Sequence, residues 1–117
     1  FWQEPKLTNV WLGTTAEDQE HFDRRWNILS QVPAVVRFIS YEPAIGLLSD
    51  ITADDGTTVP DWLICGGESG PQARMMQPDW ARCAKRICKF HGTKFFMKQM
   101  TGKKPIPPDL MVREFPR

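Results

Sequence analysis

The sequence has no apolar run long enough to cross a membrane, since its longest hydrophobic stretches fall far short of about 18 residues. Its start also lacks a basic segment followed by an apolar one, so we expect neither a secretory signal nor membrane contact. Only three cysteines and two histidines occur among the 117 residues. An odd number of cysteines without tight pairs argues against a disulfide framework and favours a reducing, cytoplasmic setting.

The few cysteines and histidines also limit the chemistry of the chain. Cys83 and Cys88 lie five positions apart in a predicted helix, which separates them by about 140° around its axis. Two thiols placed in this way do not easily coordinate one metal ion, and each is expected to be a small residue of the core. No spacing supports a Ser-His-Asp or Cys-His arrangement. We therefore expect no metal site within this chain.

The common phosphate-binding loops are also absent, although residues 61–74 read DWLICGGESGPQAR. A P-loop needs a Lys-Ser or Lys-Thr pair directly before a helix, and a dinucleotide-binding turn needs the spacing G-x-G-x-x-G. Neither pattern occurs, and the next predicted helix begins near residue 78, well beyond Gly70. Two interpretations remain: a plain corner with a solvated Glu68, or a turn whose glycines let a ligand approach the backbone.

Alternating strand and helix patterns are what the sequence does contain. Four apolar runs rich in β-branched and aromatic residues predict strands over residues 9–15, 34–43, 61–67 and 93–100. A helical pattern separates the first two strands, another separates the last two, and residues 44–60 form a long connection without a convincing helix. This order predicts an α/β fold with a parallel four-stranded sheet and crossover connections, followed by an extended tail.

The two helices have recognisable ends. The first is predicted over residues 16–31, with Thr14 and Glu17 at the spacing of a capping box. The second begins near Pro78 and ends at Gly92, where a glycine cap belongs. The predicted organisation is a lead-in segment at 1–8, an α/β domain at 9–100 and an extended, proline-rich tail at 101–117.

Polar residues follow each predicted strand, and the carboxyl ends of parallel strands meet at one rim, where ligands of such folds bind. The candidate catalytic residues at this rim are Glu42, Glu68 and Lys98. The candidate cofactor contacts are Thr15, Gly66, Gly67, Ser69 and Arg74. Grouped carboxylates can act as acid or base, and an arginine can bind an anion through two donors.

Charge is distributed unevenly along the chain. Residues 1–69 carry four cationic and eleven acidic side chains, a net charge of −7, whereas residues 70–117 carry eleven and three, a net charge of +8. The basic half suggests an alternative function as a nucleic-acid-associated module. Its candidate contacts are Arg82, Lys85, Arg86, Lys89, Lys103 and Lys104. A cationic face that only balances the acidic half is the simpler interpretation.

Several phrases resemble a phage-associated and bacterial family of uncharacterised proteins. They read NVWLGTTAEDQ, VVRFISYEPAIG, DWLICGGESGPQARMMQPDW and KFFMKQMTGKKPIPPDLMVREFP, and together they span nearly the whole chain from Asn9. The segment GGESGPQAR and the strand KFFMKQ are the most distinctive. That family looks like the radical SAM enzymes, which have a partial or complete (β/α) barrel. The resemblance therefore implies that residues 9–100 form the parallel four-stranded half of such a barrel.

The resemblance implies S-adenosylmethionine and a [4Fe–4S] cluster at the barrel rim of the full-length protein. Cluster ligation needs three or four thiolates in one loop, and this chain has no cysteine triplet, so we expect it to bind neither group alone. The chain corresponds to a C-terminal half, and its partner is expected to be the N-terminal half of the same barrel, in the same or another chain. The isolated chain is then expected to be inactive. A non-catalytic scaffold is a further alternative.

Overall fold

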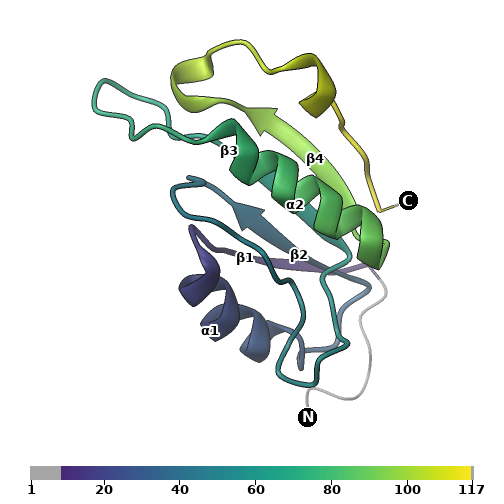
Figure 1. Cartoon of the computed structure of the whole chain (residues 1–117). Coiled ribbons are helices and arrows are strands. Elements are labelled where there is room, and N and C mark those ends of the chain that lie inside the picture. The colour runs from purple at the N-terminus through teal and green to yellow at the C-terminus, as the bar shows by residue number, and fades with distance from the viewer. Residues whose placement is uncertain (1–8, 117) are drawn as a thin grey trace.

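The structure, a computed structural model, describes residues 9–116, so the predicted lead-in at 1–8 lies outside them. Its main elements are β1 (Trp11–Thr15), α1 (Gln19–Leu29), β2 (Val36–Tyr41), β3 (Trp62–Gly66), α2 (Pro78–His91) and β4 (Lys94–Gln99) (Figure 1). The strands are parallel and their order in the sheet is β1-β2-β3-β4. This confirms the predicted α/β fold. No helix in this part of the chain is long and apolar enough to span a bilayer.

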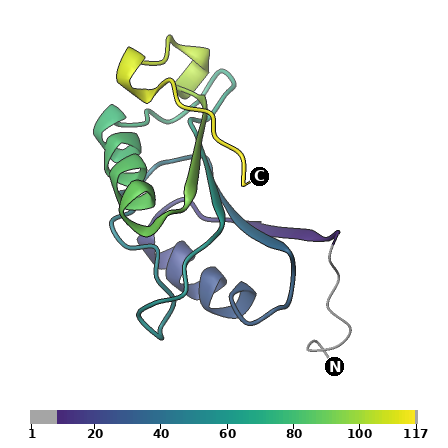
Figure 2. The ribbon, with the colours of Figure 1, turned by 90° about the vertical axis from the view of Figure 1, so that its right-hand side faces the viewer.

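Both helices pack on the same face of the sheet (Figures 1 and 2). Ile39 of β2, Leu63 of β3 and Phe95 of β4 point to this face and share one buried cluster with Trp26 of α1 and Ala84 of α2. Strands in sequential order with helices on one face are the arrangement of a (β/α) barrel, whereas doubly wound sheets have helices on both faces. The fold is therefore half-barrel-like.

The long connection between β2 and β3 also lies on the helical face, in place of a crossover helix. Its Leu48 and Ile51 are fully buried in the same core. Helix α1 anchors it, because the Gln19 Oε1 atom accepts two backbone N–H groups of the connection, at 2.9 and 3.0 Å. The indole Nε1–H of Trp26 donates to the Thr58 carbonyl oxygen at 3.0 Å. An irregular segment can thus cover the sheet as a helix would.

The start of α1 differs from the prediction. Asp18, not a Thr14–Glu17 capping box, caps the helix, and its side chain accepts the backbone N–H of His21 at 2.9 Å. Thr14 belongs to β1, while the Glu17 carboxylate pairs with Arg25 at 3.2 Å. Aspartate is among the strongest N-cap residues, and its extended backbone delays the helix to residue 19. The predicted end of α2 is confirmed, because Gly92 is the C-cap, with φ of 78°.

The tail covers one edge of the sheet. After two short 3₁₀ turns (Thr101–Lys103 and Pro108–Leu110), it runs antiparallel to β4. Met97 N–H donates to the Val112 carbonyl at 2.8 Å, and Glu114 N–H donates to the Phe95 carbonyl at 2.9 Å. Within residues 9–116, no strand pairs with the outer edge of β1. The sheet therefore has one covered edge and one edge open to a further strand.

An aromatic cluster covers the sheet face opposite the helices. Trp62 lies at its centre, with ring centroids 5.8 Å from Trp11, 5.7 Å from Phe38, 6.1 Å from Phe96 and 5.5 Å from Phe115. Trp11 is 43% exposed and Phe115 54% exposed. All-parallel sheets are normally covered on both faces. This aromatic face has no layer of helices over it within the described part of the chain (Figure 2).

Candidate functional site at the strand ends

A hollow of about 380 Å³ lies where the carboxyl ends of the four strands meet. Its lining residues are Thr15, Ser40, Glu42, Pro43, Gly67, Glu68, Ser69, Lys98 and Gln99. Six of the eight predicted rim residues are in this set. The other two lie beside it, because Gly66 lies against the Glu42 carboxylate and Arg74 binds Glu68. Parallel strands thus gather residues from four distant segments of the sequence.

An ion pair in the hollow joins Glu42, just after β2, to Lys98 of β4. The Lys98 Nζ atom lies 3.3 Å from Glu42 Oε2 and 3.5 Å from Oε1. The Ser40 hydroxyl donates to Oε1 at 2.7 Å, which fixes the carboxylate. Lys98 is 52% exposed and Glu42 23% exposed. A half-exposed ammonium with a long contact to its partner keeps donors free for a ligand.

An irregularity in the sheet positions this lysine. Cys65 of β3 pairs with Met97 of β4, but the next residue, Gly66, pairs with Gln99, so the register shifts by one residue at Lys98. Shifts of this kind are frequent beside functional sites, where they re-aim a side chain. The Gln99 side chain donates to the Gly67 carbonyl at 3.0 Å, which fixes the strand end beyond the shift.

Glu68 and Arg74, both predicted to face a ligand, bind each other. Arg74 Nε donates to Glu68 Oε1 at 2.9 Å, Nη2 donates to Oε2 at 2.8 Å, and the Arg74 backbone N–H also donates to Oε1 at 2.8 Å. The carboxylate thereby closes residues 68–74 into a loop. These bonds lower the pKa of Glu68 from its usual 4.5 to about 2. Glu68 is thus ionised at neutral pH and forms a wall of the hollow. A carboxyl group with so low a pKa suits neither a general acid nor a general base.

This contact predicts an acid-dependent loosening of the loop. A lowered pKa means that the ionised Glu68 stabilises the folded loop above about pH 4.5, and that this stabilisation is lost as the pH falls toward about 2. Carboxyl-selective NMR titration should report the low pKa for Glu68, and the Arg74→Met variant should bring it back toward 4.5. An unshifted pKa in the unmodified chain would contradict the contact.

The two glycines at the end of β3 are required by close contacts within the chain. A Cβ atom on Gly67 would lie 2.3 Å from the Thr101 backbone nitrogen and 2.7 Å from the Met100 carbonyl carbon. A Cβ atom on Gly66 would lie 2.8 Å from Glu42 Oε2. Gly67 therefore lets the segment after β4 approach β3, and Gly66 leaves room for the Glu42 carboxylate. Both glycines shape the hollow through contacts within the chain.

Four residues that the sequence analysis did not select also shape the rim, namely Ser40, Pro43 and Gln99 of the hollow and Arg25 beside it. Arg25 of α1 donates to the Thr15 carbonyl at 2.8 Å and to its hydroxyl at 3.1 Å, and it also pairs with Glu17. Arg25 lies ten residues from Thr15 on the polar part of a helix, so no local pattern marks it as a rim residue. Its charge at the end of β1 balances Glu17 and holds Thr15 in place.

The cysteines lie away from the hollow. Cys65 and Cys88 are buried in the core between the sheet and α2, and burial raises the pKa of both thiols, that of Cys88 to about 12. Cys83 is partly exposed. Among residues 9–116, no group of three or more His, Cys, Asp and Glu residues lies close enough together to hold a metal ion. An iron–sulfur cluster therefore does not fit this part of the chain.

The six basic residues of the alternative function lie at two different places. Lys85 and Lys89 line a pocket beside α2, whereas Lys103 and Lys104 line a hollow next to Lys98. Arg82 is engaged within the chain, because it pairs with Asp79 at 2.9 Å and with Asp109 at 2.8 Å. Arg86 is exposed on α2. The basic half thus presents two separate cationic surfaces.

The fold and the rim define an α/β protein of the half-barrel type with a polar hollow at its strand ends. The chain belongs to the family described as "Protein of unknown function (DUF5131)", whose model matches residues 2–109. No curated protein and no solved structure matches it. The family description names no activity, so the resemblance to radical SAM enzymes and the phage association stay predictions.

Proposed function

We propose that the chain is the C-terminal wall of a radical-SAM-like barrel and that its rim binds S-adenosylmethionine. The Glu42–Lys98 pair at the rim of a singly wound parallel sheet carries this proposal. Ligands of such sheets bind at the carboxyl ends of the strands. The free cysteines fit the cytoplasmic setting that the sequence predicts.

The donor set of the hollow fits a ligand that has both an ammonium and a carboxylate group. The Glu42 carboxylate suits the ammonium, and the Lys98 ammonium suits the carboxylate. The hydroxyls of Thr15 and Ser40 add neutral partners in the lining of the hollow. When bound together with a reduced iron–sulfur cluster, S-adenosylmethionine supplies radical chemistry. The role of this chain is then to bind and orient the ligand.

The cluster and the facing wall require a partner, which we propose is the N-terminal half of the same barrel. The outer edge of β1 is the only edge of the sheet left open among residues 9–116, since the tail pairs with β4. Preceding strands of a sequentially ordered sheet would add at this edge. The partner would also cover the aromatic face around Trp62, because parallel sheets are normally buried on both sides.

The test measures, by calorimetry, the binding of S-adenosylmethionine to the full-length protein. The measurement is made before and after anaerobic iron–sulfur reconstitution. We expect cluster absorbance after reconstitution and saturable binding of the ligand. Glu42→Gln and Lys98→Met should each weaken binding by about tenfold or more, because each removes one charge-assisted hydrogen bond. The Glu20→Gln variant on the outer face of α1 is the matched control, since Glu20 pairs only with an exposed Arg24 among the described residues.

Two results would reject the proposal. Absence of cluster absorbance with both halves present would remove the radical SAM assignment. Binding that is unchanged in Glu42→Gln and Lys98→Met would remove the rim as its site. A phenotype untouched by replacing both Glu68 and Lys98 would instead favour the non-catalytic scaffold. Far-ultraviolet circular dichroism of each variant separates a lost contact from a lost fold.

A further inference from the structure

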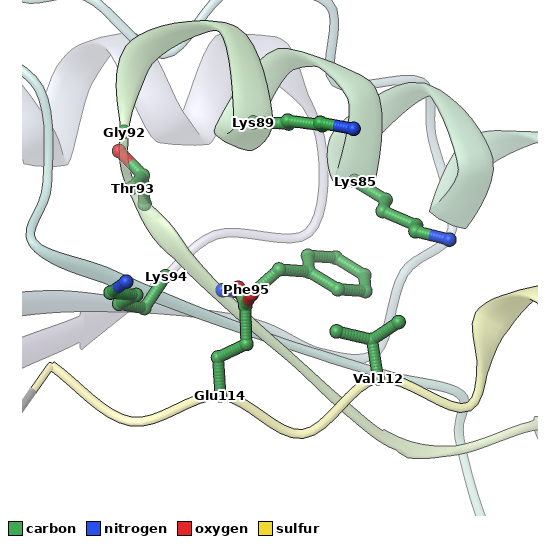
Figure 3. Close-up of a pocket in the computed structure, with 8 residues that line it drawn as sticks. All are labelled: Lys85, Lys89, Gly92, Thr93, Lys94, Phe95, Val112 and Glu114. Carbon is green, nitrogen blue, oxygen red and sulfur yellow. Dashed lines mark hydrogen bonds between the residues drawn. The ribbon is translucent and has the colours of Figure 1, made fainter.

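A second surface, on the outside of α2, combines several lysines with an exposed aromatic ring. Lys85 and Lys89 of α2 and Lys94 of β4 line a pocket of about 330 Å³. In Figure 3, the Lys85 and Lys89 side chains extend from α2, and Lys94 lies on the other side of the pocket, at the start of β4. Helices form the outer ring of a barrel, so this surface lies away from the proposed ligand site.

The charge of this pocket is strongly positive. Its one carboxylate, Glu114, accepts the backbone N–H of Phe95 at 2.9 Å and is directed at the strand (Figure 3). Lys85 makes one contact, to the Asp109 carbonyl at 2.5 Å, which leaves its charge unbalanced. Within residues 9–116, neither Lys89 nor Lys94 forms an ion pair. The surface is therefore complementary to an anion with several charges.

Phe90 is the feature that a merely solvated cationic face does not explain. Its side chain is 84% exposed, although burial of a phenylalanine ring contributes about 1.5–3 kcal/mol. On a helix, residues three and four positions apart are neighbours, so Phe90 lies beside Arg86, and Arg86 lies beside Lys89. The cations near the helix end also suit its dipole, but the dipole gives no reason for an exposed ring.

We infer that this surface binds single-stranded nucleic acid. A base stacks on Phe90, while Lys89, Lys94 and Arg86 contact the flanking phosphates. Exposed aromatic rings beside cationic tracks are the usual means by which proteins bind single strands without sequence preference. An acidic peptide would satisfy the lysines but would make no use of the exposed Phe90 ring, which packs only against the edge-on His91 ring, 4.9 Å away between centroids, among the described residues. The inference is independent of the proposed ligand at the rim.

The test is fluorescence anisotropy of the full-length protein with labelled oligothymidylate and oligouridylate. We expect binding at low salt that weakens steeply between about 50 and 200 mM, because phosphate contacts release counterions. The Phe90→Ala variant should weaken binding by about tenfold, and a Lys89→Glu, Lys94→Glu double variant by more. A Lys103→Glu, Lys104→Glu double variant is the control, because it makes the same charge change at the other cationic surface.

Three outcomes would overturn the inference. One is the absence of binding to either strand at low salt. Another is an equal loss of binding in the Lys103→Glu, Lys104→Glu control, which would show that the oligonucleotide is attracted only by the overall charge of the protein. The third is displacement by polyglutamate with no effect of Phe90→Ala, which would assign the surface to an acidic peptide. The Glu42→Gln variant should bind both strands normally, so failure of the proposed rim function leaves this test intact.

Discussion

Replacing Gly67 with alanine should unfold the protein at a markedly lower denaturant concentration. The added Cβ atom would lie 2.3 Å from the Thr101 nitrogen, and this neighbour is backbone that cannot rotate away. Overpacking of this kind costs about 3 kcal/mol, at the upper end of the usual range. The hydrogen bond from Gly67 N–H to the Gln99 carbonyl, at 2.8 Å, would be strained by the same displacement. Urea denaturation followed by tryptophan fluorescence measures the loss.

The neighbouring glycine provides the matched control. In Gly66→Ala the added atom meets Glu42 Oε2 at 2.8 Å, which is the end of a side chain that can move. We therefore expect a smaller loss of stability, but a disturbed Glu42–Lys98 pair and weaker ligand binding at the rim. If Gly67→Ala were as stable as the unmodified chain, the close approach of the segment after β4 to β3 would be wrong.

The alternation of strands and helices could be predicted because it depends on local patterns. Pro78 and Gly92 mark the ends of α2 by their own backbone preferences, and the structure confirms both predicted ends. The start of α1 could not be fixed in the same way, because Thr14, Glu17 and Asp18 all have capping chemistry. The choice among them depends on tertiary contacts, namely β1 pairing for Thr14 and the Arg25 ion pair for Glu17.

The rim could be predicted in outline, because parallel strands bring their carboxyl ends together whatever the rest of the chain does. The partners within it could not. Glu42 and Lys98 are 56 residues apart, and their contact depends on the order of the sheet and on the register shift at Lys98. Glu68 and Arg74 were each predicted to face a ligand, but their spacing lets them satisfy each other.

The tail and the aromatic face were beyond sequence reasoning for a related reason. A proline-rich segment indicates an extended chain but not the surface it follows. The tail is positioned by backbone bonds to β4 and by the indole of Trp62, which donates to the Glu114 carbonyl at 2.9 Å. Trp62 alternates with Leu63 along β3, so one faces the aromatic cluster and the other the core. Without the positions of the helices, the sequence does not say which face is covered.

Trp26→Ala should cause the largest loss of stability among single core substitutions in α1. The ring is fully buried, packs against Phe22 with centroids 6.4 Å apart, and lies under the Arg37 guanidinium at 5.7 Å. Truncation of a buried tryptophan costs about 3–5 kcal/mol. The indole is also an anchor of the β2–β3 connection, through Thr58. The free energy of unfolding from urea denaturation should fall by this amount.

Trp26→Phe separates the two contributions of the indole. It keeps most of the buried ring but leaves the Thr58 carbonyl without its donor, which costs about 1–3 kcal/mol. Hydrogen exchange should then rise in residues 52–58 while β2 and β3 stay protected, because the connection loses its anchor to α1. Equal exchange in the connection and the strands would mean that the connection unfolds only with the whole sheet. The connection would then be an integral layer of the fold, held by Leu48 and Ile51 rather than by Trp26.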